Sequence, residues 1–154
     1  KAMKITDNFT LAELTKTSVK ANNTPNHLQT ANLCRLCFYL LQPIRDRIAR
    51  PLDITSGFRS DAVNKAVGGS GVSQHLDGMA ADINCSTISK ADLFRLIAKE
   101  FDYDQCILEL DSNCLHVSYF MAGRNRGDIL VRNKIDGKYV YDKYTKKQLD
   151  TLNV

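Results

Sequence analysis

The stretch SQHLDGMAAD, residues 73–82, decides the fold. It places an imidazole, His75, and a carboxylate, Asp82, seven positions apart, with small residues between them. A second imidazole, His116, follows in LHVSY, residues 115–119, a run with the alternation of a β-strand. Two histidines and one acid form the set of three protein ligands that a catalytic zinc ion uses, with the fourth position left to water. The sequence therefore predicts a Zn²⁺ site built from His75, Asp82 and His116.

Length and composition predict a single globular domain spanning residues 1–154. Of the 154 residues, 44% are hydrophobic and 25% are charged, which are ordinary values for one soluble domain. No repeat, low-complexity segment or linker interrupts the chain, and we expect residues 1–8 and 145–154 to be frayed. The net charge of +4 comes from scattered lysines and arginines, so we expect no nucleic-acid partner. We expect a monomer.

The cysteines and the apolar runs indicate where the protein is made. Five cysteines cannot all be paired within one chain, and Cys34 and Cys37 fall inside a helical apolar pattern. We interpret this pair as core residues rather than as a redox site, which favours synthesis in a reducing compartment. No apolar run is long enough to span a membrane. No signal peptide is visible at the N-terminus, so we expect synthesis in the cytoplasm.

Periodicity and turn residues predict an α+β fold. Short strands are expected at 52–55, 79–84, 105–110, 115–120, 129–132 and 138–141. Helices are expected at the capping-box segment 9–14, at 25–49, at 61–67 and after Ser89. Strands 105–110 and 115–120 should form one hairpin, and the last two strands should form another around Asp136 and Gly137. The predicted architecture is a small antiparallel sheet that carries the metal on one face and is packed by helices.

The helix at 25–49 is predicted to begin with Thr24 as its cap and Pro25 at its first position. Pro43 should kink this helix or end its first part, because proline removes a backbone donor. Residues at spacings of three and four predict its buried stripe, namely Leu28, Ala31, Cys34, Cys37, Phe38, Leu41, Ile44 and Ile48. His27 opens the helix and is given no functional role.

A hydrolytic zinc site also needs a base that takes a proton from water and passes it to the leaving amine. Alternation puts Glu109 on the same face as Gln105 and Ile107. If that strand pairs with the strand of His116, Glu109 stands near the site and is the first candidate for the base. Asp111, in the connection between the two strands, is the second candidate.

These residues resemble one family, the zinc D-alanyl-D-alanine carboxypeptidases and related cell-wall endopeptidases. That family includes many phage endolysins and shares its fold with the hedgehog signalling domain. The resemblance runs from about residue 9 to residue 126, and its most specific parts are HxxGxAxD at 75–82 and LHVS at 115–118. Supporting segments are FTLAEL (9–14), LQPIR (41–45), SGFRS (56–60), Asn64, VGG (67–69) and SQH (73–75).

The resemblance implies that His75, Asp82 and His116 bind zinc. It also implies that Arg59 reaches the substrate or the oxyanion, and that Ser73 contacts the substrate. The alternative for Arg59 is a structural clamp on its loop, and the alternative for Ser73 is a capping role in its loop.

Two departures from the family pattern affect the site. Cys114 stands where many members have a tryptophan, and Asn113 stands where some have an acidic base. We interpret Cys114 as a packing residue, and a metal contact from its thiol is the alternative. Glu109 matches the acidic residue in the corresponding Gln-x-x-x-Glu strand of similar family members.

Three functional hypotheses follow. The first is a zinc metallopeptidase that hydrolyses peptidoglycan stem peptides, made in the cytoplasm and acting on the cell wall. The second is a zinc-bound cell-wall binding or structural module without hydrolysis. The third differs from the first only in the bond that is cut and in context, as a phage or prophage lysis factor or virion component that cuts between L- and D-residues.

Overall fold

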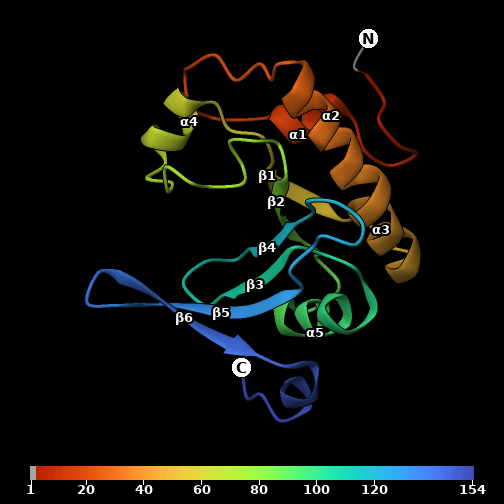
Figure 1. The fold of residues 1–154 in the computed structure, drawn as a ribbon, viewed down its shortest axis with the longest axis vertical. Helices are drawn as coiled ribbons and strands as arrows, with labels where there is room; N and C mark the ends of the chain where they lie inside the picture. The colour runs from red at the N-terminus through yellow and green to blue at the C-terminus, as the bar shows by residue number, and fades with distance from the viewer. Residues whose placement is uncertain (1–2) are drawn as a thin grey trace.

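The computed structural model describes residues 3–154 and shows a six-stranded sheet with helices packed against it (Figure 1). The helical segments are α1 (Leu11–Thr15), α2 (His27–Leu36), the π-helical η1 (Cys37–Leu41), α3 (Gln42–Ile48), α4 (Asp61–Ala66), α5 (Lys90–Glu100) and the 3₁₀ helix η2 (Lys146–Asp150). The strands are β1 (Asp53–Ser56), β2 (Ala80–Asn84), β3 (Gln105–Glu109), β4 (Leu115–Ser118), β5 (Asp128–Ile135) and β6 (Lys138–Tyr144). This mixed architecture is consistent with the predicted α+β class. Within residues 3–154, no helix has the length and apolar character needed to cross a membrane.

The sheet has the strand order β1-β2-β4-β3-β5-β6. Both predicted hairpins are confirmed, since β3 pairs antiparallel with β4 and β5 pairs antiparallel with β6. The prediction of a small, purely antiparallel sheet is wrong in one respect, because β5 runs parallel to β3. The outer edge of β4 is already paired with β2, so the chain leaving β4 crosses to the open edge of β3. This crossing places β5 and β6 beside the strand of Glu109.

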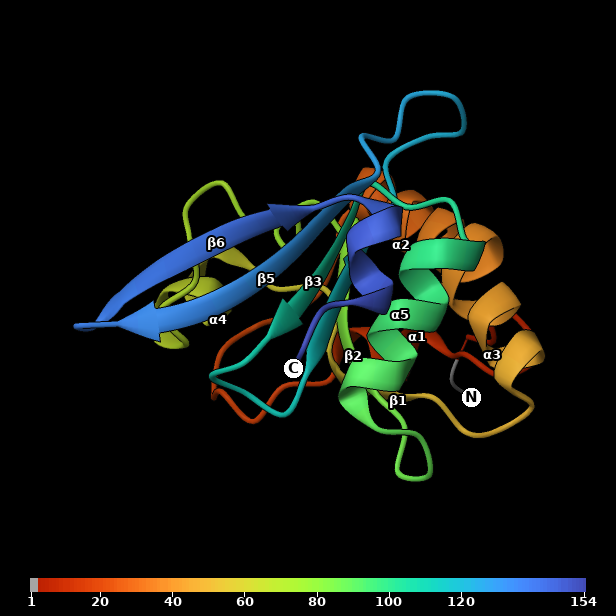
Figure 2. The same cartoon turned by 90° about the horizontal axis from the view of Figure 1, so that it is seen from below.

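The two faces of the sheet have different chemistry. One face is buried and packs against α5 and the α2–α3 helix (Figure 2); its side chains are Ala81, Ile83, Cys106, Leu108, Leu115, Val117, Ile129 and Val131. Because side chains alternate along a strand, the register brings Asp82, His116 and Glu109 together on the opposite face. Helix α4 lies on that opposite side (Figure 2). The alternation of the strands therefore separates the core from the polar site.

The long helix shows how proline acts on helical geometry. Pro43 offers no N–H, and the five residues before α3 form the π-helical segment η1, in which the N–H of Gln42 bonds to the carbonyl of Cys37. The predicted kink is thus a local change in hydrogen bonding. The start of this helix was predicted wrongly: Asn26, not Thr24, caps α2 and forms a reciprocal capping box with Gln29.

The buried stripe of the long helix was also predicted in part wrongly. Leu28 is 71% exposed and Phe38 is 66% exposed, whereas Cys37, Leu41, Ile44 and Ile48 are buried as expected. Leu33, Leu36 and Leu40 are fully buried in their place. Leucines occur on more than one side of this helix, so their spacing alone does not determine which side faces the core.

The C-terminal tail is folded rather than frayed. Leu149 of η2 is fully buried, and Arg95 of α5 donates hydrogen bonds to the carbonyls of Leu149 and Leu152 at 3.2 Å and 2.7 Å. At the other end, Lys4 pairs with Thr10 in an isolated β-bridge, and residues 1–2 lie outside the described part of the chain.

Candidate metal centre

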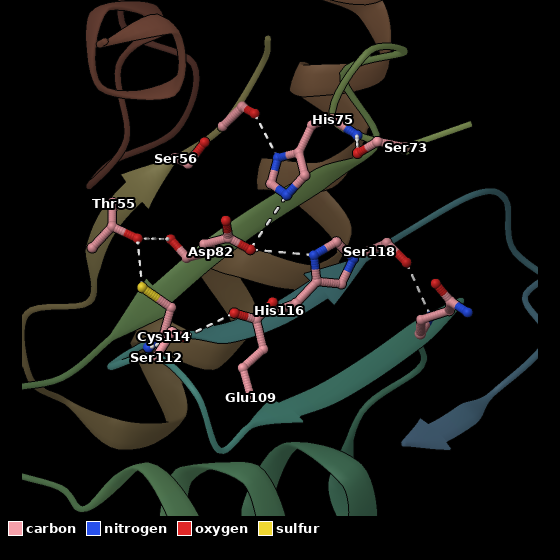
Figure 3. A network of polar contacts seen from close by, with 12 residues as sticks. Thr55, Ser56, Ser73, His75, Asp82, Glu109, Ser112, Cys114, His116 and Ser118 are labelled. Atoms are coloured by element: carbon pink, nitrogen blue, oxygen red, sulfur yellow. Dashed lines mark hydrogen bonds and ion pairs between the residues drawn. The ribbon is translucent and has the colours of Figure 1, made fainter. Parts of the chain in front are cut away.

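The three predicted metal ligands lie together although they come from distant segments (Figure 3). Asp82 of β2 and His116 of β4 are direct partners in the register, and His75 approaches from the loop before β2. The Oδ1 atom of Asp82 lies 3.3 Å from Nε2 of His75 and 3.2 Å from Nδ1 of His116. One ligand atom from each residue lies within 4.8 Å of the other two. The structure therefore brings the predicted zinc ligands into one cluster.

The loop that carries His75 is fixed by close backbone packing. Gly78 has φ +73°, and a Cβ added there would lie 2.5 Å from the carbonyl oxygen of Gln29 in α2. Only glycine combines this conformation with such close approach at low cost. The N–H of Arg59 also donates to the carbonyl of His75 at 3.1 Å. These contacts hold the loop against α2 and over the sheet.

The donor set fits a zinc ion. Nδ1 of His75 donates to the carbonyl of Gly57 at 2.7 Å, so a neutral His75 presents the lone pair of Nε2 to the carboxylate oxygen of Asp82. Burial lowers the pKa of His75, which favours this neutral form. A lone pair facing a carboxylate oxygen is repulsive unless a cation lies between them. Tetrahedral zinc with bonds of about 2.0–2.2 Å separates its ligands by about 3.3 Å, close to the two distances from Oδ1 of Asp82 to the imidazole nitrogens.

Arg59 contacts Asp82, one of the three predicted metal ligands. Its Nη2 lies 3.0 Å from Oδ2 of Asp82, and its Nε donates to Oγ of Ser56 at 2.9 Å. This leaves Oδ1 of Asp82 directed at the two imidazoles. Burial alone would raise the pKa of Asp82, but the two imidazoles, in their protonated forms, outweigh it and hold this pKa well below its usual range. Arg59 thus clamps its loop, as the alternative interpretation holds, while its side chain also lines the cleft beside the site. Its contact with substrate remains a prediction.

Glu109, the first candidate for the base, lies in the same cleft as the three ligands. Its Oε2 accepts hydrogen bonds from Oγ of Ser112 at 2.8 Å and from Nη2 of Arg132 at 2.9 Å. No described protein group donates to its Oε1, so this oxygen can take a proton. Burial raises the pKa of Glu109, and the nearby carboxylate of Asp82 raises it further. A raised carboxyl pKa makes Glu109 a better proton acceptor than an exposed glutamate.

Asp111, the second candidate, is placed differently. Arg132 grips both of its carboxylate oxygens, with Nε donating at 3.0 Å and Nη2 at 2.9 Å. Hydrogen bonds from Arg132 outweigh the effect of burial and lower the pKa of Asp111. Asp111 is also outside the lining of the cleft. The geometry favours Glu109 over Asp111 as the base.

Two further predicted residues lie close to the centre. Oγ of Ser73 accepts from the N–H of His75 at 3.3 Å, which is the capping role in the loop, and Ser73 also lines the cleft. The sulfur of Cys114 lies 3.1 Å from Oγ1 of Thr55 (Figure 3). Among the described residues, the cluster of potential ligands contains His75, Asp82 and His116 without Cys114. This supports packing rather than metal contact for Cys114.

The ligands and Glu109 lie in a cleft of about 690 Å³. One wall is the loop that follows α4, and the opposite wall is the β5–β6 hairpin, which contributes Arg132, Tyr139 and Tyr141. None of these three residues was predicted from the sequence as part of the site. The sequence predicted strands at 129–132 and 138–141, but no local motif connects these residues with the predicted metal ligands. Knowledge of the parallel pairing of β3 with β5 would have been needed to find them.

Comparison with known proteins agrees with this site. A search of curated proteins found no significant match. The family described as Peptidase M15 matches residues 7–118, which include His75, Asp82 and His116, as well as Glu109 and Arg59, and end before β5. The match covers more than two thirds of the chain, so the protein belongs to the peptidase M15 family of metallopeptidases.

Proposed function

We propose that this protein is a zinc-dependent peptidase that hydrolyses peptide bonds in peptidoglycan stem peptides, as a D-Ala-D-Ala carboxypeptidase or a cell-wall endopeptidase. The observation that carries the proposal is the cluster of three possible ligand atoms, Oδ1 of Asp82, Nε2 of His75 and Nδ1 of His116. A zinc ion bound there would polarise a carbonyl and lower the pKa of water from 15.7 to about 7. Membership of the family supports the class of substrate.

The residues of the chain supply the remaining parts of the reaction. His75, Asp82 and His116 would hold the ion, with His75 oriented by the carbonyl of Gly57. Oε1 of Glu109 would accept a proton from water and return it to the leaving amine. Arg59 would hold the substrate or stabilise the oxyanion from the position that it takes beside Asp82, as a guanidinium offers a planar fork to either.

Residues in the walls of the cleft would contact the substrate. Ser73 lies on the rim of the same cleft, where its hydroxyl hydrogen is available to a substrate carbonyl because the known contact uses its oxygen as acceptor. We propose that the enzyme acts as a monomer on the cell wall, in a bacterial or a phage context.

The second candidate, a non-catalytic zinc-bound module, rests on the absence of an acid at Asn113. Glu109 weakens that argument, because it supplies a buried carboxylate with one free oxygen in the same cleft. A binding module has no need of a carboxylate with a raised pKa beside the metal ligands.

The test compares two matched variants of the neighbouring acids. Glu109→Gln keeps the shape of the side chain, and we expect it to retain zinc in elemental analysis while kcat falls by about 10²–10⁴-fold, the usual contribution of a base. Asp111→Asn should lower kcat far less. Product mass spectrometry on digested cell wall identifies the bond that is cut.

The metal ligands provide the second arm of this test. His75→Ala and His116→Ala should lose both zinc and cleavage. A wild-type protein that retains zinc and binds peptidoglycan fragments but leaves them uncut would establish the binding module instead. Full activity of Glu109→Gln would remove Glu109 from the mechanism without affecting the assignment of the ligands.

A further inference from the structure

The β5–β6 hairpin lies outside the part of the chain that matches the family and still forms a wall of the cleft. Figure 2 shows it projecting beyond the other strands on the side of α4. Its two tyrosines that line the cleft, Tyr139 and Tyr141, are each 50% exposed. They are two residues apart on one strand, so both rings lie on the site face of the sheet. Half-exposed rings side by side in a catalytic cleft are typical of a ligand-binding surface.

The position of Tyr139 is fixed by its neighbours on β5. The guanidinium of Arg132 lies 4.3 Å from the ring centroid of Tyr139, and the ammonium of Lys134 lies 5.6 Å from it. Such cation–π contacts hold an exposed ring in one orientation. A ring that is already ordered loses little conformational entropy when a ligand binds. The surface is therefore prepared for binding before the substrate arrives.

Two of the three cations beside the tyrosines are paired with carboxylates, whereas Lys134, which lies over Tyr139, pairs with no carboxylate among the described residues. Arg132 is engaged with Glu109 and Asp111, and Lys143 lies 3.0 Å from a carboxylate oxygen of Asp128. A ligand at Tyr141 thus meets an apolar ring face and a hydroxyl edge, while the cations Arg132 and Lys134 lie against the neighbouring ring of Tyr139. A pyranose ring, with C–H groups on its faces and hydroxyls at its edge, matches the ring face and the hydroxyl of Tyr141.

The sheet register places this surface relative to the base. Glu109 pairs with Arg132 on β5, and Arg132 pairs with Tyr141 on β6, so the three residues form one row across the sheet. Two strand spacings of about 4.8 Å separate the backbone of Tyr141 from that of Glu109 by about 10 Å. An extended peptide covers this distance with about three residues.

We propose that Tyr139 and Tyr141 form a subsite for the sugar to which the stem peptide is attached, so that the bond cut lies about three residues from that sugar. This inference rests on the proposed function and adds to it a second substrate class, the neutral aminosugar of the glycan strand. It also assigns a role to the hairpin, which the metal centre itself does not need.

The experiment compares two substrates with the zinc-loaded full chain: a disaccharide-bearing stem peptide and the same peptide without sugars. For the wild type, we expect kcat/KM to be about tenfold higher on the sugar-bearing substrate, mainly through a lower KM. Tyr141→Ala should reduce this preference to about one, and Tyr141→Phe, which keeps the ring, should preserve it. Val140→Ala is the matched control, because Val140 lies between the two tyrosines on the opposite face of β6.

Two results would overturn the subsite. The first is a wild type with no preference for the sugar-bearing substrate, and the second is a Tyr141→Ala variant that loses activity equally on both substrates, which would place the peptide on the rings. Product masses test the spacing, since release of a sugar that carries a single residue would contradict it.

The subsite is also tested independently of hydrolysis. Binding of the free disaccharide, followed by changes in NMR chemical shifts, should be seen with the wild type and lost in Tyr141→Ala. Absence of cleavage with sugar binding retained would refute the proposed function alone, and cleavage without sugar binding would refute the subsite alone.

Discussion

Replacement of Arg132 tests how Glu109, the proposed base, is oriented. Its guanidinium bridges Glu109 and Asp111 through contacts of 2.9 Å to each carboxylate, and it comes from the hairpin beyond the family match. Replacing it with methionine keeps the length of the side chain but removes one of the two donors to Oε2 of Glu109. Ser112 remains as the other donor. Glu109 should then stay in the cleft with a less defined orientation.

The expected losses of folding stability and of kcat in Arg132→Met follow from burial and geometry. Removing one partner of a buried ion pair costs about 3–5 kcal/mol of folding stability. The side chains of Arg132, Glu109 and Asp111 are 16%, 10% and 17% exposed, so water can partly replace the guanidinium, and we expect a loss of about 2–3 kcal/mol. Displacement of a catalytic group by about 1 Å can cost about 10²-fold in rate, and with one donor retained we expect kcat to fall by about 10–100-fold.

The assay is steady-state hydrolysis of a stem peptide without sugars, with zinc content and urea denaturation measured on the same samples. KM should change by less than about threefold, because Arg132 acts on the base rather than on the substrate. The acid limb of the kcat profile should also move to higher pH, since Arg132 opposes the burial that raises the pKa of Glu109. Arg132→Lys should recover part of kcat.

Arg126→Met is the matched control. Arg126 also lines the cleft and binds a carboxylate, that of Asp104, but has no contact with Glu109. An Arg132→Met variant that is destabilised but has unchanged kcat would refute the reasoning and reduce Arg132 to a structural ion pair. A rise in KM at constant kcat would refute it differently, by showing that Arg132 contacts the substrate.

Four other predictions concern the metal, the loop, the thiols and pH. Zinc added to metal-stripped protein should raise the melting temperature in calorimetry, with about 4 kcal/mol of stabilisation at a free concentration of 1,000 Kd, and His116→Ala should abolish this shift. Gly78→Ala should cost more than about 1 kcal/mol in urea denaturation, because φ is +73° and the added Cβ would lie 2.5 Å from a carbonyl oxygen. Iodoacetamide at pH 8 should leave Cys37 unmodified in the native protein, as judged by mass spectrometry, because burial raises the pKa of its thiol to about 12. Burial alone would raise the pKa of Asp104, but hydrogen bonds from Arg126 outweigh it and lower this pKa. The stability lost in Asp104→Asn should therefore be largest above the unfolded pKa of about 3.9 and should vanish as pH falls through the lower folded pKa. Denaturation measured between pH 7 and pH 2 tests this dependence.

The metal cluster could be predicted because its information is local. The motif at 75–82 holds two ligands, and strand alternation in 115–119 directs His116 to one face. Once β2 and β4 pair with Asp82 opposite His116, little further information is needed. Likewise, the position of Glu109 followed from alternation and a short hairpin, both of which a sequence shows directly.

The long helix could be predicted only in part. Its kink followed from Pro43, whose missing N–H acts wherever the residue stands. Its buried side did not follow, because Leu28 and Leu33 are equally apolar and the choice between them depends on what packs against the helix. Its cap was misplaced because Thr24 and Asn26 are both good capping residues, and Asn26 prevails through its reciprocal bonds with Gln29.

The wall of the cleft that the β5–β6 hairpin forms could not be predicted from local sequence patterns. Arg132 lies 23 positions after Glu109 in sequence, and the two meet only because β5 pairs parallel with β3 in one particular register. A shift of one residue would turn Arg132 to the core face and remove a donor from the base. The family match ends before this strand, so the three predicted ligands and Glu109 belong to the part of the chain that matches the family, while Arg132, which binds Glu109, comes from the hairpin. Proton transfer in this protein should therefore depend on the hairpin even though metal binding does not, and these two properties should separate when the hairpin is altered.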